Sequence, residues 1–338
     1  MRALVTGCAG FIGSTLCDRL LQEGHDVLGL DSFTDYYDPR AKRRNIEVLA
    51  QHSAFALHEL DLAADDLVDA VAGRDAVFHL AGQPGVRQSW ESGFAPYVTA
   101  NVLATQRVLE ASRCAGVERV VYASSSSVYG NADRYPCSEE DLPAPHSPYG
   151  VTKLAGEHLA RLYARNFGLP TVSLRYFTVF GPRQRPEMAM SRVITAGLTG
   201  EPFPDFSPAG AVRDFTYVDD VVAATIAAGT VPDLPPGLVC NVAGGAPATM
   251  HEVISLVEQA LGRPVPVTRQ DQCAGDVVRT GGRTDRAADL LGWTARVGLA
   301  EGVRRQVEAR TAPFLIPTQA DSARSGLVRE REQLGAMS

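Results

Sequence analysis

The sequence predicts a doubly wound α/β fold, in which helices cover both faces of a parallel sheet, together with a smaller mixed α/β domain. Two observations lead to this prediction. Up to about residue 176, short apolar stretches alternate with helical patterns without interruption, and that alternation is typical of βαβ units. Beyond it, prolines and glycines separate shorter elements. We expect a first domain over 1–176, a second over 177–312 and a weakly ordered tail over 313–338.

The chain begins with a strand, a glycine-rich turn and a helix. Residues 3–6 are apolar, residues 14–22 have a helical pattern, and the turn between them holds three glycines spaced three apart: Gly7, Gly10 and Gly13. This spacing lets backbone N–H groups approach a pyrophosphate at the helix N-terminus. A second strand over 26–30 ends at Asp31, where a carboxylate would bind the ribose hydroxyls of NAD and repel the 2′-phosphate of NADP. The sequence therefore predicts a Rossmann-type NAD site, with a tight turn that binds no ligand as the alternative.

The remaining elements of this half keep the same order. Strands are expected over 55–60, 76–80, 117–123 and 170–176, helices over 101–114 and 149–167, and a further strand of the sheet near 238–243. Ligands of such sheets bind beside the carboxyl ends of the strands. Asp61 and Leu62 are therefore candidates for adenine contact, and the small residues Ala81 and Gly82 would let a cofactor pass close to the backbone.

Two polar features of this half have more than one interpretation. His79 lies in the fourth strand with no carboxylate or nucleophile beside it in the sequence, which favours a hydrogen-bonded core histidine over a catalytic one. The basic run Arg40, Lys42, Arg43 and Arg44 fits the start of a solvated helix. Contacts to the adenosine side of a cofactor are the alternative for this run.

Tyr149 and Lys153 form the clearest catalytic candidate. They stand four residues apart at the opening of a predicted helix, and residues at this spacing share a face. A lysine beside a tyrosine favours the phenolate and lowers the phenol pKa from about 10 toward the range of a general base. The pair alone is a weak motif, because a surface helix pair has the same spacing. The serine run 124–127 adds hydroxyl groups at the end of the fifth strand.

The second half contributes scattered arginines rather than a local motif. Several guanidinium groups converging on a cleft would suit a diphosphate and a carboxylate, because each binds such groups bidentately. Surface ion pairing is the alternative. The stretch 213–220 is expected to open a helix. The arginines concerned are Arg185, Arg192, Arg213 and Arg279.

Composition excludes several classes of function. The 338 residues carry a formal net charge of −7, which argues against a nucleic-acid or anionic-membrane partner. No apolar run is long enough to span a bilayer. The 6 cysteines form no C-x-x-C pair and the 7 histidines show no ligand spacing, so we expect no metal site. With no secretory leader recognised, we expect reduced, mostly buried thiols in a cytoplasmic protein.

Taken together, the glycine trio, Asp31, the serine run, the Tyr149/Lys153 pair and Arg213-Asp214-Phe215 resemble the extended short-chain dehydrogenase/reductase family of NAD-dependent nucleotide-sugar epimerases and dehydratases. The resemblance covers the chain to about residue 310. Three local stretches are similar to the UDP-glucuronate 4-epimerases in particular: 35–38, 83–87 and 177–189. The sequence departs from their pattern at Pro84, at Arg183-Gln184 and in the loop 205–211.

The resemblance implies a role for each candidate residue. The catalytic residues would be Ser125, Tyr149 and Lys153. NAD would contact Gly7, Gly10, Phe11, Ile12, Gly13, Asp31, Ser32, Asp61, Leu62, Leu80, Ala81, Gly82, Asn101, Ser124, Tyr149, Lys153 and Tyr176. A UDP-sugar substrate would contact Gln83, Arg87, Ser125, Ser126, Tyr149, Thr178, Arg185, Met188, Arg192, Arg213, Asp276 and Arg279.

Within this family, the residues after the catalytic hydroxyl distinguish the reactions. A 4,6-dehydratase usually carries an Asp-Glu pair there, and a uronate decarboxylase commonly carries Glu at the second position. Here the positions are Ser126 and Ser127, which favours epimerisation at C4 of UDP-glucuronate. A UDP-glucose/UDP-galactose 4-epimerase, a UDP-glucuronate decarboxylase and a non-enzymatic NAD-binding regulator are the alternatives. Arg185 is expected to hold the uronate, unless it pairs with Glu187 or a phosphate.

The resemblance also implies a homodimer. Family members commonly pair the two helices that correspond here to 101–114 and 149–167 into a four-helix bundle. The same apolar side chains that would form this interface could instead cover the sheet: Leu103, Val108, Leu154, Leu159 and Leu162.

Overall fold

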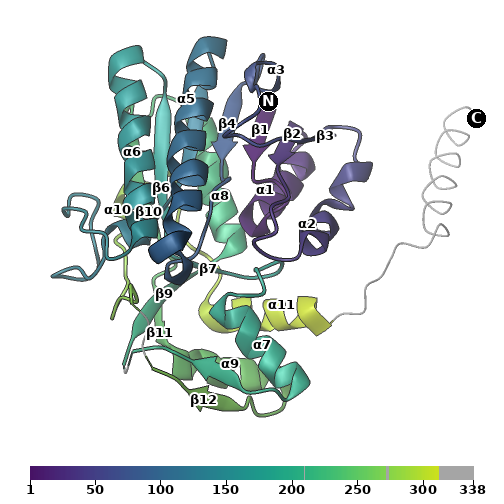
Figure 1. Cartoon of the computed structure of the whole chain (residues 1–338), viewed down its shortest axis with the longest axis vertical. Helices are drawn as coiled ribbons and strands as arrows, with labels where there is room; N and C mark the ends of the chain where they lie inside the picture. Colours follow the sequence, from purple (N-terminus) through teal and green to yellow (C-terminus); the bar gives the residue numbers. More distant parts are fainter. Residues whose placement is uncertain (209, 272–273, 312–338) are drawn as a thin grey trace, which may run out of the picture.

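A seven-stranded parallel sheet forms the larger part of the molecule, and a group of smaller elements lies at one end of it (Figure 1). The structure, a computed structural model, describes residues 1–208, 210–271 and 274–311, so the predicted tail over 313–338 lies outside the described residues. The strands of the sheet are β1 (Arg2–Thr6), β2 (Asp26–Asp31), β3 (Phe55–Glu59), β4 (Ala76–His79), β5 (Arg119–Ser125), β6 (Thr171–Tyr176) and β10 (Leu238–Val242). The doubly wound fold predicted from the sequence is confirmed.

The strand order β10-β6-β5-β4-β1-β2-β3 places a topological switch point between β1 and β4. The chain winds from β1 outward to β3, and then crosses back to β4 and winds the other way. Helices that leave β1 and β4 therefore cover opposite faces, and a crevice opens between the carboxyl ends of these two strands. All six strand pairs of the sheet are parallel, so all seven carboxyl ends meet at this edge.

Each face of the sheet has its own hydrophobic core, because alternate residues of a strand point to opposite sides. Leu4 packs with Val108 of α5 on one face, where Figure 1 shows α5 and α6 side by side. Val5 packs on the other face with Leu16 of α1 and Val221 of α8. The helices around the sheet are α1 (Phe11–Gln22), α2 (Pro39–Ile46), α3 (Val68–Val71), α4 (Phe94–Tyr97), the π-helical turn η4 (Val98–Leu103), α5 (Ala104–Ala115), α6 (Pro148–Phe167) and α8 (Val218–Thr230).

The smaller elements belong to the second half of the chain. A three-stranded sheet contains β7 (Thr178–Phe180), β9 (Val212–Tyr217) and β11 (Ala246–Thr249), and a two-stranded sheet pairs β8 (Phe203–Asp205) with β12 (Val267–Arg269). The helices of this half are α7 (Ala189–Thr199), α9 (Met250–Leu261), α10 (Asp285–Leu291) and α11 (Leu299–Thr311). Short 3-10 turns occur at η1 (Leu49–Gln51), η2 (Arg87–Ser89), η3 (Glu91–Gly93) and η5 (Ser126–Val128).

The prediction that residues 213–220 open a helix is wrong for the first five of them. They form β9, which pairs with β7 in parallel and with β11 in antiparallel fashion, and the helix α8 begins only at Val218. Phe215 and Tyr217 of β9 are buried against Phe180, with ring centroids 5.9 and 5.6 Å away. These cross-strand contacts, which the local pattern does not reveal, favour the strand over the helix.

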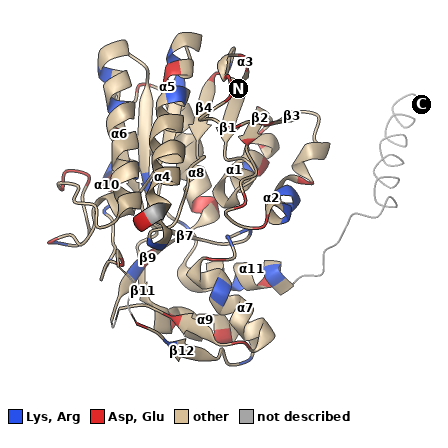
Figure 2. Cartoon of the chain, in the orientation of Figure 1, with Lys and Arg blue, Asp and Glu red and all other residues tan. Residues whose placement is uncertain are grey.

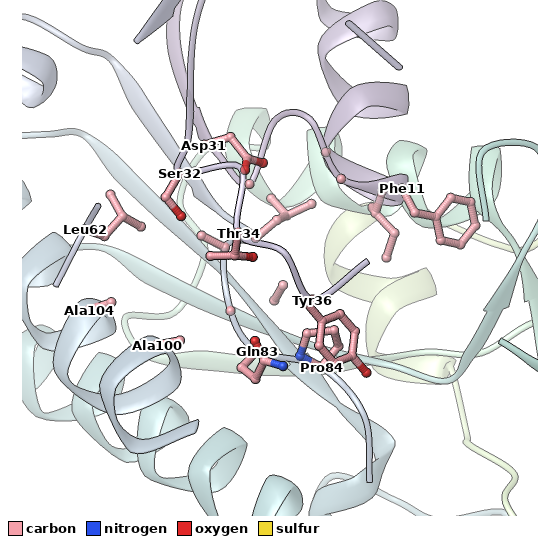
Figure 3. A pocket seen from close by; sticks show the side chains of 18 of the residues that line it. Phe11, Asp31, Ser32, Thr34, Tyr36, Leu62, Gln83, Pro84, Ala100 and Ala104 are labelled. Atoms are coloured by element: carbon pink, nitrogen blue, oxygen red, sulfur yellow. The ribbon is translucent and has the colours of Figure 1, made fainter. Parts of the chain in front are cut away.

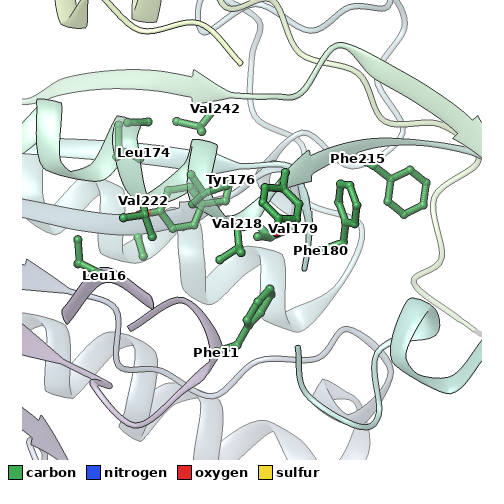
Figure 4. Packing of buried hydrophobic residues seen from close by; sticks show 14 of the residues in the cluster. Phe11, Leu16, Leu174, Tyr176, Val179, Phe180, Phe215, Val218, Val222 and Val242 are labelled. Atoms are coloured by element: carbon green, nitrogen blue, oxygen red, sulfur yellow. The ribbon is translucent and has the colours of Figure 1, made fainter. Parts of the chain in front are cut away.

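One cluster of buried side chains crosses the predicted domain boundary at residues 176/177. It contains Leu174 and Tyr176 of β6 together with Phe180 and Phe215 of the second half, and Figure 4 shows these side chains in one continuous row. The division into two domains therefore stays a prediction.

Charges of both signs are scattered over the elements in the view of Figure 2. No helix among the described residues is both long and apolar enough to cross a membrane. The same ranges contain no group of three His, Cys, Asp or Glu side chains placed to hold a metal ion. Of the described cysteines, Cys8, Cys17, Cys137 and Cys240 are buried free thiols and Cys114 is an exposed one.

Candidate active site

A pocket lies at the carboxyl edge of the large sheet and extends from the end of β2 to the start of α6. Figure 3 shows Asp31 and Ser32 at one end and Tyr36 and Gln83 at the other. Every predicted cofactor-binding residue except Asn101 lines it: Gly7, Gly10, Phe11, Ile12, Gly13, Asp31, Ser32, Asp61, Leu62, Leu80, Ala81, Gly82, Ser124, Tyr149, Lys153 and Tyr176. Three of the predicted substrate-binding residues also line it: Gln83, Tyr149 and Arg185.

The glycine turn leaves no room for side chains. Gly7 has a φ of 71°, and its N–H donates to the carbonyl of Leu30 at 2.7 Å. A Cβ on Gly13 would lie 2.1 Å from the Gly7 oxygen. The first turn of α1 has no side-chain cap, so its N–H groups are available to an anion. These features fit the pyrophosphate of a dinucleotide.

Asp31 is buried at the end of β2 with both carboxylate oxygens held. Oδ1 accepts from Phe33 N at 2.8 Å and Oδ2 from Ala9 N at 3.1 Å. Lys42 lies 3.7 Å from Oδ1 and donates to Thr34 Oγ1 at 3.1 Å. The carboxylate therefore has a fixed orientation beside the pocket, as a ligand for ribose hydroxyls requires.

Lys42 differs from the rest of its basic run. Its side chain lines the pocket and the residue is 7% exposed, whereas Arg40, Arg43 and Arg44 are exposed. Burial lowers the pKa of Lys42, and the nearby Asp31 opposes that shift. The interpretation of the run as a solvated helix start is thus wrong for Lys42, because α2 packs this one face over the mouth of the pocket.

Tyr149 and Lys153 lie one helical turn apart at the start of α6. Ser147 caps this helix by accepting from Gly150 N at 3.1 Å. The ammonium of Lys153 donates to the carbonyl of Ala123 at 2.8 Å. Burial lowers the pKa of Lys153 to about 8, and Glu157 partly opposes this.

The sequence led us to expect a lowered pKa for Tyr149, and the structure corrects this. Burial raises the pKa of the phenol, while the Ser125 hydroxyl and the Arg185 guanidinium act in the opposite direction. A buried phenolate loses hydration, and the Lys153 bond described above goes to a backbone carbonyl. Ionisation of Tyr149 therefore depends on the cations and hydroxyls around it.

The serine run divides between two roles. Ser124 is buried and donates to Glu157, whereas Ser125 accepts from Ser127 N and donates to Ser127 Oγ, both at 3.1 Å. Ser126 lies in the 3-10 turn η5 just beyond. Ser125 lies close enough to the Tyr149 phenol for its hydroxyl to lower the phenol pKa.

Arg185 has a partner that the sequence suggested as an alternative. Its Nε donates to Glu187 Oε1 at 2.6 Å, while the side chain still lines the pocket with Tyr149. No hydrogen bond of Nη1 or Nη2 is present among the described residues. The outer edge of the guanidinium can therefore bind a ligand.

A second group of predicted substrate residues lies apart from the pocket lining. Arg87 pairs with Asp276 at 2.8 Å and stacks over Phe206, and Arg213 donates to the carbonyls of Val212 and Val278. Burial lowers the pKa of Arg213, while Asp276 opposes the shift. Arg192 and Arg279 instead stack on Phe203 and Tyr135. None of these residues lines the pocket, nor do Ser125, Ser126, Thr178 and Met188.

Asn101 and His79 do not line the pocket but form hydrogen bonds to residues beside it. Asn101 accepts from Gln83 N at 2.7 Å and donates to Gln83 O at 3.0 Å. Asn101, which was expected to contact the cofactor, therefore holds the backbone of the pocket residue Gln83. His79 bonds Thr6 at 2.8 Å and Thr105 at 3.0 Å. Burial lowers the pKa of His79 to about 3, and its interpretation as a core histidine is confirmed.

Sequence reasoning gave no role to several pocket residues. Tyr36 and Tyr37 belong to the stretch 35–38 that carried part of the resemblance, which was the available signal, and burial raises the pKa of Tyr37 to about 12. Lys42 and Pro84 had signals in the basic run and in the stretch 83–87. The others carry no local signal and depend on tertiary packing: Leu30, Thr34, Leu60, Ala100, Ala104 and Ala123.

Comparisons with known proteins point to one family. Residues 3–243 match the NAD dependent epimerase/dehydratase family. The uncharacterized UDP-glucose epimerase YtcB of Bacillus subtilis strain 168 is 40% identical over 308 residues, which cover 91% of this chain and 97% of that protein.

Solved structures show the same relationship over the whole described fold. UDP-glucuronic acid 4-epimerase from Bacillus cereus, in complex with UDP-glucuronic acid and NAD, has a TM-score of 0.89 and 40% identity and covers 91% of this chain and 98% of its own. MoeE5 in complex with UDP-glucuronic acid and NAD has a TM-score of 0.83 and 43% identity, with 92% and 99% covered. MoeE5 has also been solved with UDP-glucose and NAD. This chain belongs to the NAD-dependent epimerase/dehydratase family.

Proposed function

We propose that this protein is an NAD-dependent epimerase that inverts C4 of a UDP-hexuronic acid and so interconverts UDP-glucuronate and UDP-galacturonate. The observation that carries the proposal is a single pocket that joins the glycine turn and Asp31 to Tyr149, Lys153 and Arg185. A dinucleotide site, a proton-transfer pair and a carboxylate-binding guanidinium are the three parts that this reaction needs.

Tyr149 is the proposed base for the sugar 4-hydroxyl. Lys153, protonated and held by the Ala123 carbonyl, favours the phenolate from one side. On the other side the Ser125 hydroxyl would turn its proton from Ser127 Oγ to the phenolate oxygen. When bound, NAD would take a hydride from C4 and return it to the opposite face, so the cofactor undergoes no net change. Between the two transfers Tyr149 holds the proton, and the 4-keto sugar must turn over within the pocket.

Arg185 is the proposed uronate-binding residue. Its Nε is held by Glu187, and its outer edge can bind the C5 carboxylate bidentately. The bond between C5 and the carboxylate breaks most readily when it is aligned with the C4 carbonyl π system. A carboxylate held out of that alignment keeps its carbon dioxide, which favours epimerisation over decarboxylation.

The products formed from a panel of UDP-sugars test this proposal. We expect UDP-galacturonate from UDP-glucuronate, without added NAD if the cofactor purifies with the protein, and no product from Tyr149→Phe. UDP-pentose as the main product would assign a decarboxylase. Efficient turnover of UDP-glucose would favour the second candidate, a neutral-sugar 4-epimerase. Two observations favour this candidate: the similarity to YtcB, named as a UDP-glucose epimerase, and the UDP-glucose complex of MoeE5.

We also propose that two copies pair through α5 and α6. The two helices lie side by side, and Leu162 of α6 (53% exposed) and Leu103 at the end of η4, just before α5 (46% exposed), are left on the outer surface. Val108 is buried against the sheet and Leu159 packs on the same core, while Leu154 packs beside Val128 and Tyr129. Of the five apolar side chains expected at the interface, two therefore remain candidates.

We further propose a cytoplasmic location, which the free thiols among the described residues support.

A further inference from the structure

Glu157 is a buried carboxylate that the mechanism above does not use. It follows Tyr149 and Lys153 at the same four-residue spacing along α6, so the three side chains lie on one face of the helix. The residue is 2% exposed. We propose that Glu157 is a positioning residue that fixes the Ser124 hydroxyl as a hydrogen-bond acceptor toward the cofactor pocket. The inference rests on the proposed NAD site.

The direction of the Ser124 hydrogen bond follows from its partner. Ser124 Oγ lies 2.5 Å from Glu157 Oε1, and an ionised carboxylate can only accept. The single hydroxyl proton of Ser124 is therefore committed to Glu157 in a short, charge-assisted bond. Since Ser124 also lines the pocket, its lone pairs are what a ligand meets there.

Arg175 of β6 holds the carboxylate in this orientation. Its Nε donates to Glu157 Oε1 at 2.9 Å and its Nη2 to Oε2 at 2.8 Å, with both side chains at most 4% exposed. Its Nη1 donates to Tyr129 OH at 2.8 Å, and Tyr129 in turn donates to Asn241 Oδ1 at 2.7 Å. These hydrogen bonds link Glu157 of α6 through Arg175 of β6 and Tyr129 to Asn241 of β10. The carboxylate cannot turn away from Ser124 without breaking the fork.

The fixed acceptor predicts which chemical group it selects. Ser124 shares the pocket with Tyr149 and Lys153, the end where the proton and hydride are exchanged. The nicotinamide ring carries a primary carboxamide at that end, and its N–H groups match the lone pairs of Ser124. A methyl ketone in place of the amide has no donor, so the same position should discriminate against it.

Competition between NAD and 3-acetylpyridine adenine dinucleotide, in which a methyl ketone replaces the amide, tests the inference. The full-length protein is equilibrated with an equal excess of both, freed of unbound nucleotide and denatured, and the released nucleotides are quantified by mass spectrometry. We expect the wild type to prefer NAD by about three- to tenfold, on the order of one hydrogen bond. Ser124→Ala should reduce the preference to less than about twofold.

The role of Glu157 is tested in a charge-neutral background. Glu157→Gln/Arg175→Met removes both buried charges together, which is better tolerated than removing one. The amide introduced at position 157 can then donate to Ser124, so the hydroxyl can point its proton into the pocket and the preference for NAD should fall as in Ser124→Ala. Ser173→Ala, a buried serine on the adjacent strand β6, is the matched control and should keep the wild-type ratio.

The outcomes separate this inference from the proposed function. A purely structural role of the pair would lower the amounts of both nucleotides and leave their ratio unchanged, which would overturn the inference. A double variant that keeps the wild-type ratio while Ser124→Ala loses it would also overturn it. Failure of the wild-type protein to bind either nucleotide would overturn the proposed NAD site, and the inference with it.

Discussion

At the scale of single residues, Arg185 decides between an acidic and a neutral sugar. Arg185→Met removes the guanidinium edge and should weaken UDP-glucuronate binding by about 1.5–3 kcal/mol, the range for a hydrogen bond to a charged group. UDP-glucose and UDP binding should change little. Titration calorimetry with the three nucleotides measures this, and Arg183→Met, in the same loop but paired with Asp18, is the control. Equal weakening of all three would show that Arg185 binds a phosphate.

Lys153 makes the reaction sensitive to alkaline pH. Because burial lowers its pKa to about 8, the ammonium is present below that pH and is lost as pH rises through it. The groups that face it are Glu157 on α6, Tyr122 on β5 and His79 on β4, and Tyr149 lines the same pocket. We expect kcat to fall above about pH 8 in a pH–rate profile. Lys153→Arg, whose guanidinium stays protonated, should lose this alkaline limb, and a wild-type profile that stays flat through the alkaline range would contradict the assignment.

Residues with a local signal could be predicted from the sequence, and those without one could not. Gly7, Asp31 and Tyr149 belong to motifs whose spacing follows from a turn, a strand end or a helix face. The burial of Lys42 depends on how α2 packs over the pocket, which no spacing within α2 reveals. The bond between Arg185 and Glu187 was anticipated only as an alternative, because a loop pattern does not show which edge of a guanidinium is used.

At the scale of elements, Gly156 sets the distance between α6 and the sheet. A Cβ there would lie 2.1 Å from the Tyr122 hydroxyl of β5, so Gly156→Ala must push the helix outward. We expect a loss of about 1–3 kcal/mol in the free energy of unfolding, as for overpacked cores, and a larger loss of kcat because Lys153 and Glu157 flank this position. Urea denaturation and steady-state kinetics measure the two effects.

Gly298→Ala is the control for that substitution, because nothing lies within 4 Å of a Cβ there and its φ is not positive. It should leave both quantities nearly unchanged. If Gly156→Ala behaved like this control, the close approach of α6 to β5 would not be needed to position the catalytic side chains.

The regular elements of the sheet were predictable because each pairs with a neighbour of the same pattern. β1 to β6 read as apolar stretches between helices, which is the pattern that βαβ units require. β9 was mistaken for the start of a helix, although the acidic pair Asp219-Asp220, which suits a helix N-terminus, lies beyond its last residue. The structure shows that this signal belongs to α8, which follows β9 without a loop.

At the scale of the whole molecule, the fold class was predictable and the assembly is not visible in one chain. The alternation of strands and helices predicts a parallel sheet covered by helices on both faces, whereas the order β10-β6-β5-β4-β1-β2-β3 was found only in the structure. The core shared by β6 and β7 was not predictable, since a loop rich in Pro, Gly and Arg reads as a boundary. Likewise, the sequence pattern of α5 and α6 does not reveal whether their apolar side chains face the sheet or a second copy.

The exposed apolar side chains of α5 and α6 provide a test of the assembly. Leu103, at the junction of η4 and α5, and Leu162 of α6 remain solvent-exposed in the single chain although α5 and α6 are packed on the sheet, and Val151 and Phe167 of α6 are exposed as well. A bundle of four helices from two copies would bury these side chains, and apolar burial drives such association.

We expect light scattering to give a dimer at micromolar concentration, and Leu103→Glu/Leu162→Glu to give a folded monomer, because the introduced carboxylates would be buried without partners. Leu142→Glu is the matched control, since Leu142 is 88% exposed and lies outside both helices, and it should leave the dimer intact. A wild-type protein that is monomeric under these conditions would remove the proposed interface, whereas a double variant that stays dimeric would place the contact on another face.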